Sequence, residues 1–183
     1  MAQLTVEERD FLTNHLTRSK EIVLNEVAGI RPDQWAFRPD EESWSMGECA
    51  DHILTIERRI FSLVSKVMQA APADPIRAAD VQHKTPKLLK AVPAREVRVQ
   101  VPAGIVNHTH TTSPEEFVGP FEEQRARLIQ YVAETQDPMH DRVAPHPVFN
   151  DLDGCQWMLM IALHGERHAN QMAELKRHPE FPK

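Results

Sequence analysis

Four helix-start signals divide this chain, and they constrain its fold more than any other feature. In each signal a Ser, Thr or Asp stands three residues before a Glu or Gln, which is the spacing of a capping box or a close variant of it. The first residues of the four signals are Thr5, Ser45, Ser113 and Asp153. Apolar residues at helical spacing follow each signal. The sequence therefore predicts four long helices, over about residues 6–28, 46–70, 114–135 and 154–177.

The connections between these helices differ in length and composition. An aromatic stretch over residues 30–44 joins the first two helices, and we expect it to pack over the end of a bundle. More than forty residues, rich in proline, form a crossover from the second helix to the third, which in a compact bundle is usually a lid or a pocket wall. Residues 96–101 within this crossover alternate between polar and apolar but are too few to found a sheet. We therefore expect an all-α four-helix bundle.

The composition limits size, partners and location. A chain of 183 residues is long enough for one well-packed domain and short for two, so residues 1–183 are expected to form a single domain. The net charge of −6, without a basic cluster, speaks against nucleic-acid binding. No apolar stretch is long enough to span a bilayer, and the N-terminus lacks the apolar segment of a signal peptide. A cytoplasmic protein without a membrane partner is expected.

The two cysteines, Cys49 and Cys155, lie in apolar helical contexts. Two such residues do not make a disulfide scaffold, and small core side chains are the better interpretation. Helical geometry places Cys155 about half a turn around its helix from His164. We expect its sulfur to point away from any site built on that histidine.

Three histidines are the strongest candidates for chemistry. His164 and His168 are four residues apart in the last predicted helix, so both imidazoles project from one face and can reach one metal ion. His52 belongs to the apolar stripe of the second helix, which should face the bundle interior. Burying three imidazoles without a shared partner would cost about 1–3 kcal/mol for each unmet polar group. A divalent ion explains their burial, and three protein ligands leave coordination positions open for reaction.

Polar neighbours of these histidines could support a metal. Imidazole ligation suits zinc, nickel, copper or iron, and the sequence does not choose among them. Gln171, three residues after His168, is placed to hydrogen-bond a ligand or a metal-bound water. Arg167 and Glu166 flank the ligands, although a solvated face or an ion pair between helices is the simpler interpretation, above all for Glu166.

Other polar residues fit a site or a purely structural role equally well. Asp51 and Glu57 lie close in sequence to His52, and His15 falls near the inner edge of the first helix. A set of residues just before the third helix could border a substrate pocket, with a histidine-bearing surface loop as the alternative. That set is Asn107, His108, His110 and Thr112.

Two segments of the chain resemble a known family. They are ESWSMGECADHI at residues 42–53 and ALHGERHANQ at residues 162–171. Their order and spacing are similar to those of the DinB-like (YfiT-type) superfamily of candidate metalloenzymes, and the resemblance extends from about residue 6 to residue 175. It implies an up-down-down-up four-helix bundle, usually a homodimer, that holds one divalent ion by three histidines. Those ligands match His52, His164 and His168, and Arg167 and Gln171 match residues common in the family's fourth helix.

The resemblance also implies a class of reaction. Some members of the family resemble thiol-dependent S-transferases, which use bacillithiol, mycothiol or glutathione, or a related isomerase, with the metal activating the thiol. We therefore expect one divalent metal ion (zinc, nickel or iron), a low-molecular-weight thiol and a small-molecule substrate. Two alternatives stay open. Hydrolysis by metal-bound water ranks second, because no general base can be placed beside the water. The third is a bundle that binds a metal or small molecule without turnover.

Overall fold

The computed structural model describes residues 3–95 and 113–183. Its four long helices are α1 (Val6–Val27), α3 (Met46–Met68), α6 (Pro114–Glu134) and α7 (Gly154–Lys176). Each begins where the capping signals predict and ends one or two residues earlier than expected. Complete capping boxes begin α1, α3 and α7, and Ser113 accepts a hydrogen bond from the Glu116 amide at the start of α6. None of the helices in these two ranges is long and apolar enough to cross a membrane.

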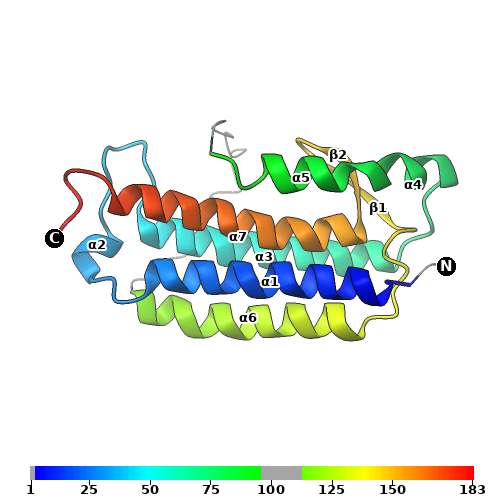
Figure 1. Ribbon diagram of the computed structural model, residues 1–183, viewed down its shortest axis with the longest axis horizontal. Helices are drawn as coiled ribbons and strands as arrows, with labels where there is room; N and C mark the ends of the chain where they lie inside the picture. The colour runs from blue at the N-terminus through cyan, green and yellow to red at the C-terminus, as the bar shows by residue number, and fades with distance from the viewer. Residues whose placement is uncertain (1–2, 96–112) are drawn as a thin grey trace.

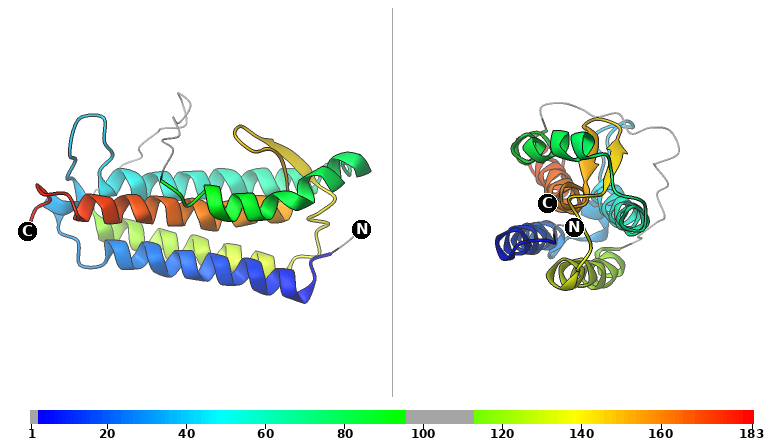
Figure 2. Two further views of the ribbon diagram at one scale, coloured as in Figure 1. Left: turned by 45° about the horizontal axis from the view of Figure 1, so that its top comes forward. Right: turned by 90° about the vertical axis from the view of Figure 1, so that its right-hand side faces the viewer.

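The four long helices pack around a common interior. α1 contacts α6 and α7, and α3 contacts the same two helices, so the four close into a ring. Figure 1 shows that α1 and α7 run in one direction along the long axis, whereas α3 and α6 run in the other. Figure 2 shows the same arrangement from the end. Because α3 and α7 are antiparallel neighbours, residues early in α3 lie beside residues in the second half of α7.

Short elements fill the connections. They are α2 (Pro32–Trp35), α4 (Pro75–Val81), a 3-10 turn (Gln82–Lys84), α5 (Thr85–Ala91), β1 (Val143–His146) and β2 (Asn150–Asp153). Part of the long crossover between α3 and α6 is thus helical, and α5 packs on α7. The alternating stretch at 96–101 lies outside the described residues. In the first connection the Trp35 side chain is buried in the core at the end of the bundle.

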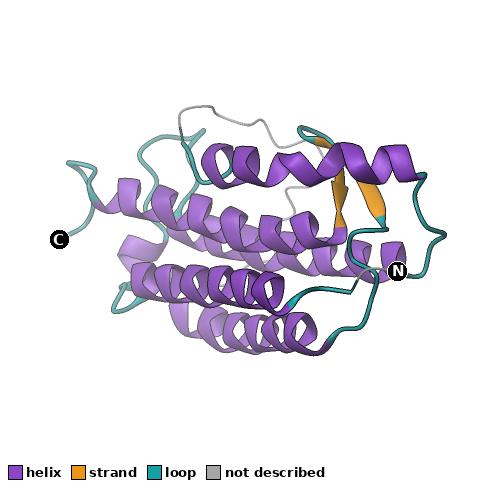
Figure 3. Cartoon of the chain, turned by 45° about the vertical axis from the view of Figure 1, so that its right-hand side comes forward, coloured by secondary structure: helices purple, strands orange, loops and turns teal. Residues whose placement is uncertain are grey.

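A two-stranded hairpin corrects the prediction of a wholly helical chain. β1 and β2 pair antiparallel just before α7, and Figure 3 shows them beside the helices. Ala144 and Leu152 are buried, and Trp157 Nε1 donates a hydrogen bond to the Ala144 carbonyl at 3.4 Å. Asn150, with φ of 57°, adopts the left-handed conformation that Asn tolerates better than most residues. The two strands are too short to be recognised in the sequence pattern, and packing against α7 stabilises them. The chain is therefore mostly helical and not wholly helical.

One guanidinium ties the four long helices together. Arg125 of α6 forms an ion pair with Glu57 of α3, and both side chains are fully buried. Arg125 Nη1 donates to Ser19 Oγ at 2.6 Å and to the Leu16 carbonyl at 3.2 Å, both on α1. Its Nη2 donates to the Ile161 carbonyl of α7 at 3.4 Å. The charge is therefore fully surrounded by acceptors, as a buried charge requires.

Gly165 provides the space that Arg125 occupies. A Cβ atom built at Gly165 would lie 2.6 Å from Arg125 Nη2, whereas one built at Gly119 meets nothing within 4 Å. We expect Gly165→Ala to destabilise the protein by about 1–3 kcal/mol, because the guanidinium cannot move without losing its acceptors. Gly119→Ala, on the exposed side of α6, should change stability by less than about 1 kcal/mol, because the better helix propensity of Ala offsets the contact of its Cβ with the following Pro120. Urea unfolding measures both, and equal stability of the two variants would contradict this prediction.

Candidate metal centre

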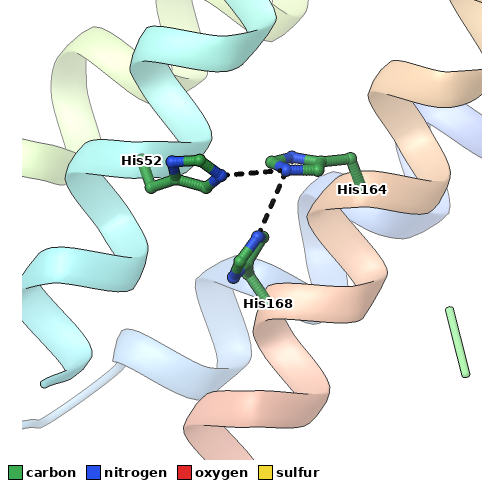
Figure 4. A group of neighbouring side chains, drawn as sticks. All are labelled: His52, His164 and His168. Carbon is green, nitrogen blue, oxygen red and sulfur yellow. Dashed lines mark hydrogen bonds between the residues drawn. The ribbon is translucent and has the colours of Figure 1, made fainter. Parts of the chain in front are cut away.

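The three histidines singled out from the sequence come together between α3 and α7. Figure 4 shows His52 of α3 facing His164 and His168 of α7, with the three rings pointing toward one another. His164 Nε2 lies 3.2 Å from His52 Nε2 and 3.2 Å from His168 Nε2. In four-coordinate zinc, Zn–N bonds of about 2.0–2.1 Å separate two ligand nitrogens by roughly 3.3–3.4 Å. The spacing fits a single ion, and this cluster could hold one.

The Gln171 side chain sets the tautomer of His168. Gln171 Oε1 accepts a hydrogen bond from Arg95 Nη1 at 3.1 Å, which assigns that atom as the amide oxygen. The same oxygen lies 3.1 Å from His168 Nδ1, so Nδ1 carries the proton and donates it. His168 Nε2 then presents its lone pair to the centre of the cluster. A metal-binding histidine has this arrangement, with its other N–H held by an acceptor.

Hydrogen bonds alone do not satisfy the three rings. If His164 Nε2 carries a proton, it can donate to His52 or His168, and His164 Nδ1 becomes an acceptor. That Nδ1 is buried and has no hydrogen-bond partner among the described residues. If His164 Nε2 carries none, its lone pair faces that of His168. A cation between the three Nε2 atoms accepts all three lone pairs, so the donor set fits a divalent metal.

The rings of His164 and His168 are in the form that binds metal. Burial lowers the pKa of both histidines well below the usual range, and the neighbouring imidazoles and guanidinium groups lower it further. Neutral imidazole is the form that ligates metal, and no proton has to leave these rings at neutral pH.

The family of the chain follows from comparison with known proteins. The family model described as DinB superfamily matches residues 15–172, a span that contains all three histidines. The chain belongs to the DinB superfamily. This DinB protein is 26% identical over 152 residues to the uncharacterized protein YuaE of Bacillus subtilis (strain 168). The aligned residues make up 83% of this chain and 89% of YuaE. No solved structure matches it.

Trp44 is a further neighbour of the cluster in this DinB protein. Its ring is stacked on His168 at 5.8 Å between centroids and 11°, and it meets His52 edge-on at 4.8 Å. Sequence reasoning placed this residue in a segment that packs over the bundle and gave it no role at the site. Its position in the sequence could have indicated such a role. Trp44 comes one residue before Ser45, the N-cap of α3, so it lies close to the first turns of the helix that carries His52.

The other polar residues of the DinB protein that the sequence singled out are spread more widely. Arg167 donates hydrogen bonds to the carbonyls of Val92 and Ala94, which follow α5, and these bonds anchor the chain on α7. Glu57 is held by Arg125 in a buried ion pair. The His15 ring packs edge-on against Phe11. The four polar residues just before α6, namely Asn107, His108, His110 and Thr112, lie outside the described residues.

The tautomer of His168 gives a prediction for metal affinity. Replacing Gln171 with methionine removes the acceptor and should weaken metal binding about 10–100-fold. Gln171→Glu keeps an acceptor oxygen and should bind metal nearly as the wild type does. Competition with a chromophoric chelator measures the affinity, with Asn170→Ala as the control, because Asn170 is exposed and its amide donates a hydrogen bond to the Pro93 carbonyl at 3.3 Å. Wild-type affinity in Gln171→Met would contradict the role assigned to Gln171.

Proposed function

We propose that this DinB protein binds one divalent metal ion through the Nε2 atoms of His52, His164 and His168. The ion would activate a low-molecular-weight thiol for S-transfer or isomerisation. The observation that carries the proposal is the convergence of three imidazole nitrogens, two of the separations being 3.2 Å, with the lone pair of His168 directed inward by Gln171. A bound divalent ion lowers the pKa of a coordinated thiol and so makes a thiolate available near neutral pH.

The residues around the three histidines suit this chemistry. Three protein ligands leave positions for a substrate sulfur. The Trp44 ring covers His168 and His52 on one side and keeps water from that side of the centre. Arg95 and Arg167 lie near enough for their charges to lower the pKa of His168. Their positive charge would attract the carboxylates of a peptide- or sugar-linked thiol.

Nearby carboxylates favour thiol activation over hydrolysis. Hydrolysis needs a base beside the attacking water. Glu57 is committed to Arg125, and Glu174 forms an ion pair with Arg95 at 3.0 Å. Neither of these two carboxylates is free to act as a base, which weighs against hydrolysis through Glu57 or Glu174.

Metal content and thiol transfer test the proposal together. We expect tag-free wild-type protein, loaded with zinc, nickel or iron, to hold about one equivalent more metal than His52→Ala, by ICP-MS. The loaded wild type should accelerate conjugation of monochlorobimane by bacillithiol, mycothiol or glutathione, and His52→Ala should give the background rate. A wild type with no more metal than His52→Ala would overturn the metal centre. A metal-loaded protein that is inactive with every thiol would overturn the S-transfer proposal and favour a binding module.

Assembly and location belong to the same proposal. We take the four long helices as the family's up-down-down-up bundle, which the helix directions in Figure 1 support. From the family resemblance we also propose a cytoplasmic homodimer. Light scattering coupled to size exclusion measures the mass, and a monomer at micromolar concentration would contradict the dimer.

A further inference from the structure

A second group of metal-binding side chains lies at the other end of the bundle. The N-termini of α1 and α7 lie at the same end of the molecule in Figure 1 and in the left view of Figure 2. There, His140 Nε2 lies 2.9 Å from Glu8 Oε1, and His140 Nδ1 lies 3.0 Å from Asp153 Oδ2. Cys155 Sγ lies 3.6 Å and 3.7 Å from the two ring nitrogens. The imidazole of His140, the thiol of Cys155 and the carboxylate of Asp153 thus have ligand atoms within 4.8 Å of one another, with Glu8 beside them, and all three are ligand types that zinc uses.

Helix capping holds both carboxylates in position. Asp153 is the N-cap of α7, and its Oδ1 accepts the Gln156 amide at 2.8 Å while Oδ2 faces the cluster. Glu8 belongs to the capping box of α1, and its Oε2 accepts the Thr5 amide at 2.9 Å while Oε1 faces the cluster. Each carboxylate therefore has one oxygen fixed by a backbone amide and one directed to His140. Such outer hydrogen bonds orient metal ligands in proteins.

The distances suit a tetrahedral ion. Zinc bonds of about 2.3 Å to sulfur and 2.0–2.2 Å to nitrogen and oxygen imply separations of roughly 3.5 Å for S to N and 3.3 Å for N to O. Through the one nitrogen Nδ1, the cluster has 3.7 Å between Cys155 Sγ and His140 Nδ1, and 3.0 Å between His140 Nδ1 and Asp153 Oδ2. The sulfur is almost equidistant from the two ring nitrogens.

The charges of the cluster complement a cation. The hydrogen bond to Asp153 is the main cause that raises the pKa of His140 to about 8, and Glu8 adds to it. Burial raises the pKa of the Cys155 thiol, and the negative charges of Asp153 and Glu8 raise it further. A divalent ion reverses this effect on the thiol, because a coordinating thiol loses its proton outright.

A cavity gives access to these groups. Its volume is about 350 Å³, and Glu8, His140, Asp153 and Cys155 line it together with Gln82 and Thr85 among others. It has room for an entering ion and for a water that completes the coordination. None of the three histidines between α3 and α7 lines it.

We propose that His140, Asp153 and Cys155 form a second metal site, specific for zinc or a similar thiophilic divalent ion, with Glu8 as an acceptor for the other ring nitrogen of His140. The site is separate from the three-histidine centre, because nine residues of α7 place Cys155 about 14 Å along the helix axis from His164. Binding forms a bond from the metal to Cys155 Sγ and to one nitrogen of His140. The protons of the thiol and of the imidazolium leave to the solvent. Metal binding at this second site does not depend on whether the three-histidine centre binds metal or catalyses a reaction.

Cobalt(II) titration tests this site, because only a thiolate ligand gives a sulfur-to-cobalt charge-transfer band in the near ultraviolet. The titration is done at mildly alkaline pH, because metal binding releases protons from the thiol and the imidazole. We expect the band in wild type and also in His164→Ala, whose three-histidine centre is disabled. Cys155→Ser should lose the band, and His140→Gln should need more than about 100-fold higher cobalt to reach it.

Cys49→Ala is the matched control, because Cys49 is the other free cysteine and lies at the far end of the bundle in α3. It should keep the full band. Circular dichroism establishes that each variant is folded at the titration temperature. A wild type without the band at saturating cobalt would overturn the second site, as would a band that survives Cys155→Ser or disappears in Cys49→Ala. Metal held by the three histidines alone gives no sulfur band, so failure of one site is distinguishable from failure of the other.

Discussion

Replacing His168 with alanine should abolish metal binding at the three-histidine centre. The Nε2 atoms of His52 and His164 remain 3.2 Å apart, but the centre loses the lone pair of His168 that Gln171 directs inward. Because loss of an outer partner alone typically costs about 10–100-fold in affinity, loss of a direct ligand should cost more. His164→Ala should abolish binding as well, since His164 Nε2 is the atom that both other rings approach.

Metal content by ICP-MS and thermal unfolding check this prediction, in the Cys155→Ser background so that no thiolate site contributes. The parent should hold about one equivalent, and zinc at 100 times the dissociation constant should stabilise it by about 2.7 kcal/mol. His168→Ala should hold none and gain nothing from zinc, while remaining folded. His83→Ala, at an exposed histidine of the 3-10 turn, should behave as the parent does. One equivalent at parental affinity in His168→Ala would rule out this ligand set.

Replacing Arg125 with methionine should destabilise the protein by about 3–5 kcal/mol. The substitution leaves Glu57 buried and unpaired, and an uncompensated buried charge is the costly outcome of breaking such a pair. The double variant Arg125→Met with Glu57→Leu removes both charges and should recover much of that loss. Urea unfolding of the wild type, the two single variants and the double variant gives the coupling energy of the pair. A loss below about 1 kcal/mol in Arg125→Met would mean that Glu57 takes up a proton at little cost.

Signals carried by neighbouring residues explain what the sequence predicted well. The capping boxes at Thr5, Ser45 and Asp153 act over three residues, so their helix starts could be located without knowledge of the fold. His164 and His168 are on one face because they are four residues apart in one helix. His52 could be added because it lies in the apolar stripe of a second helix.

The features that the sequence did not predict depend on distant contacts. The Arg125–Glu57 pair joins residues 68 apart in the chain, and Glu57 was considered only in relation to His52. The sequence pattern around His140 gives no reason to single it out, because its partners, Glu8 and Asp153, come from two other segments. The hairpin was missed because its strands have four residues each and are stabilised by packing against α7. The position of Cys155, in contrast, agrees with the helical geometry, since its sulfur lies with His140 and away from His164.

The buried Arg125 guanidinium also bears on how the bundle opens. Its partners belong to α1, α3 and α7, and Arg125 itself belongs to α6. No single long helix can leave the bundle without stripping acceptors from a charge that water cannot reach, so local release of one helix is nearly as costly as complete unfolding. Native-state hydrogen exchange should therefore report one shared opening free energy for the central amides of all four helices. The bundle behaves as one cooperative unit, in which the metal ligands on α3 and α7 come apart only when the whole core does.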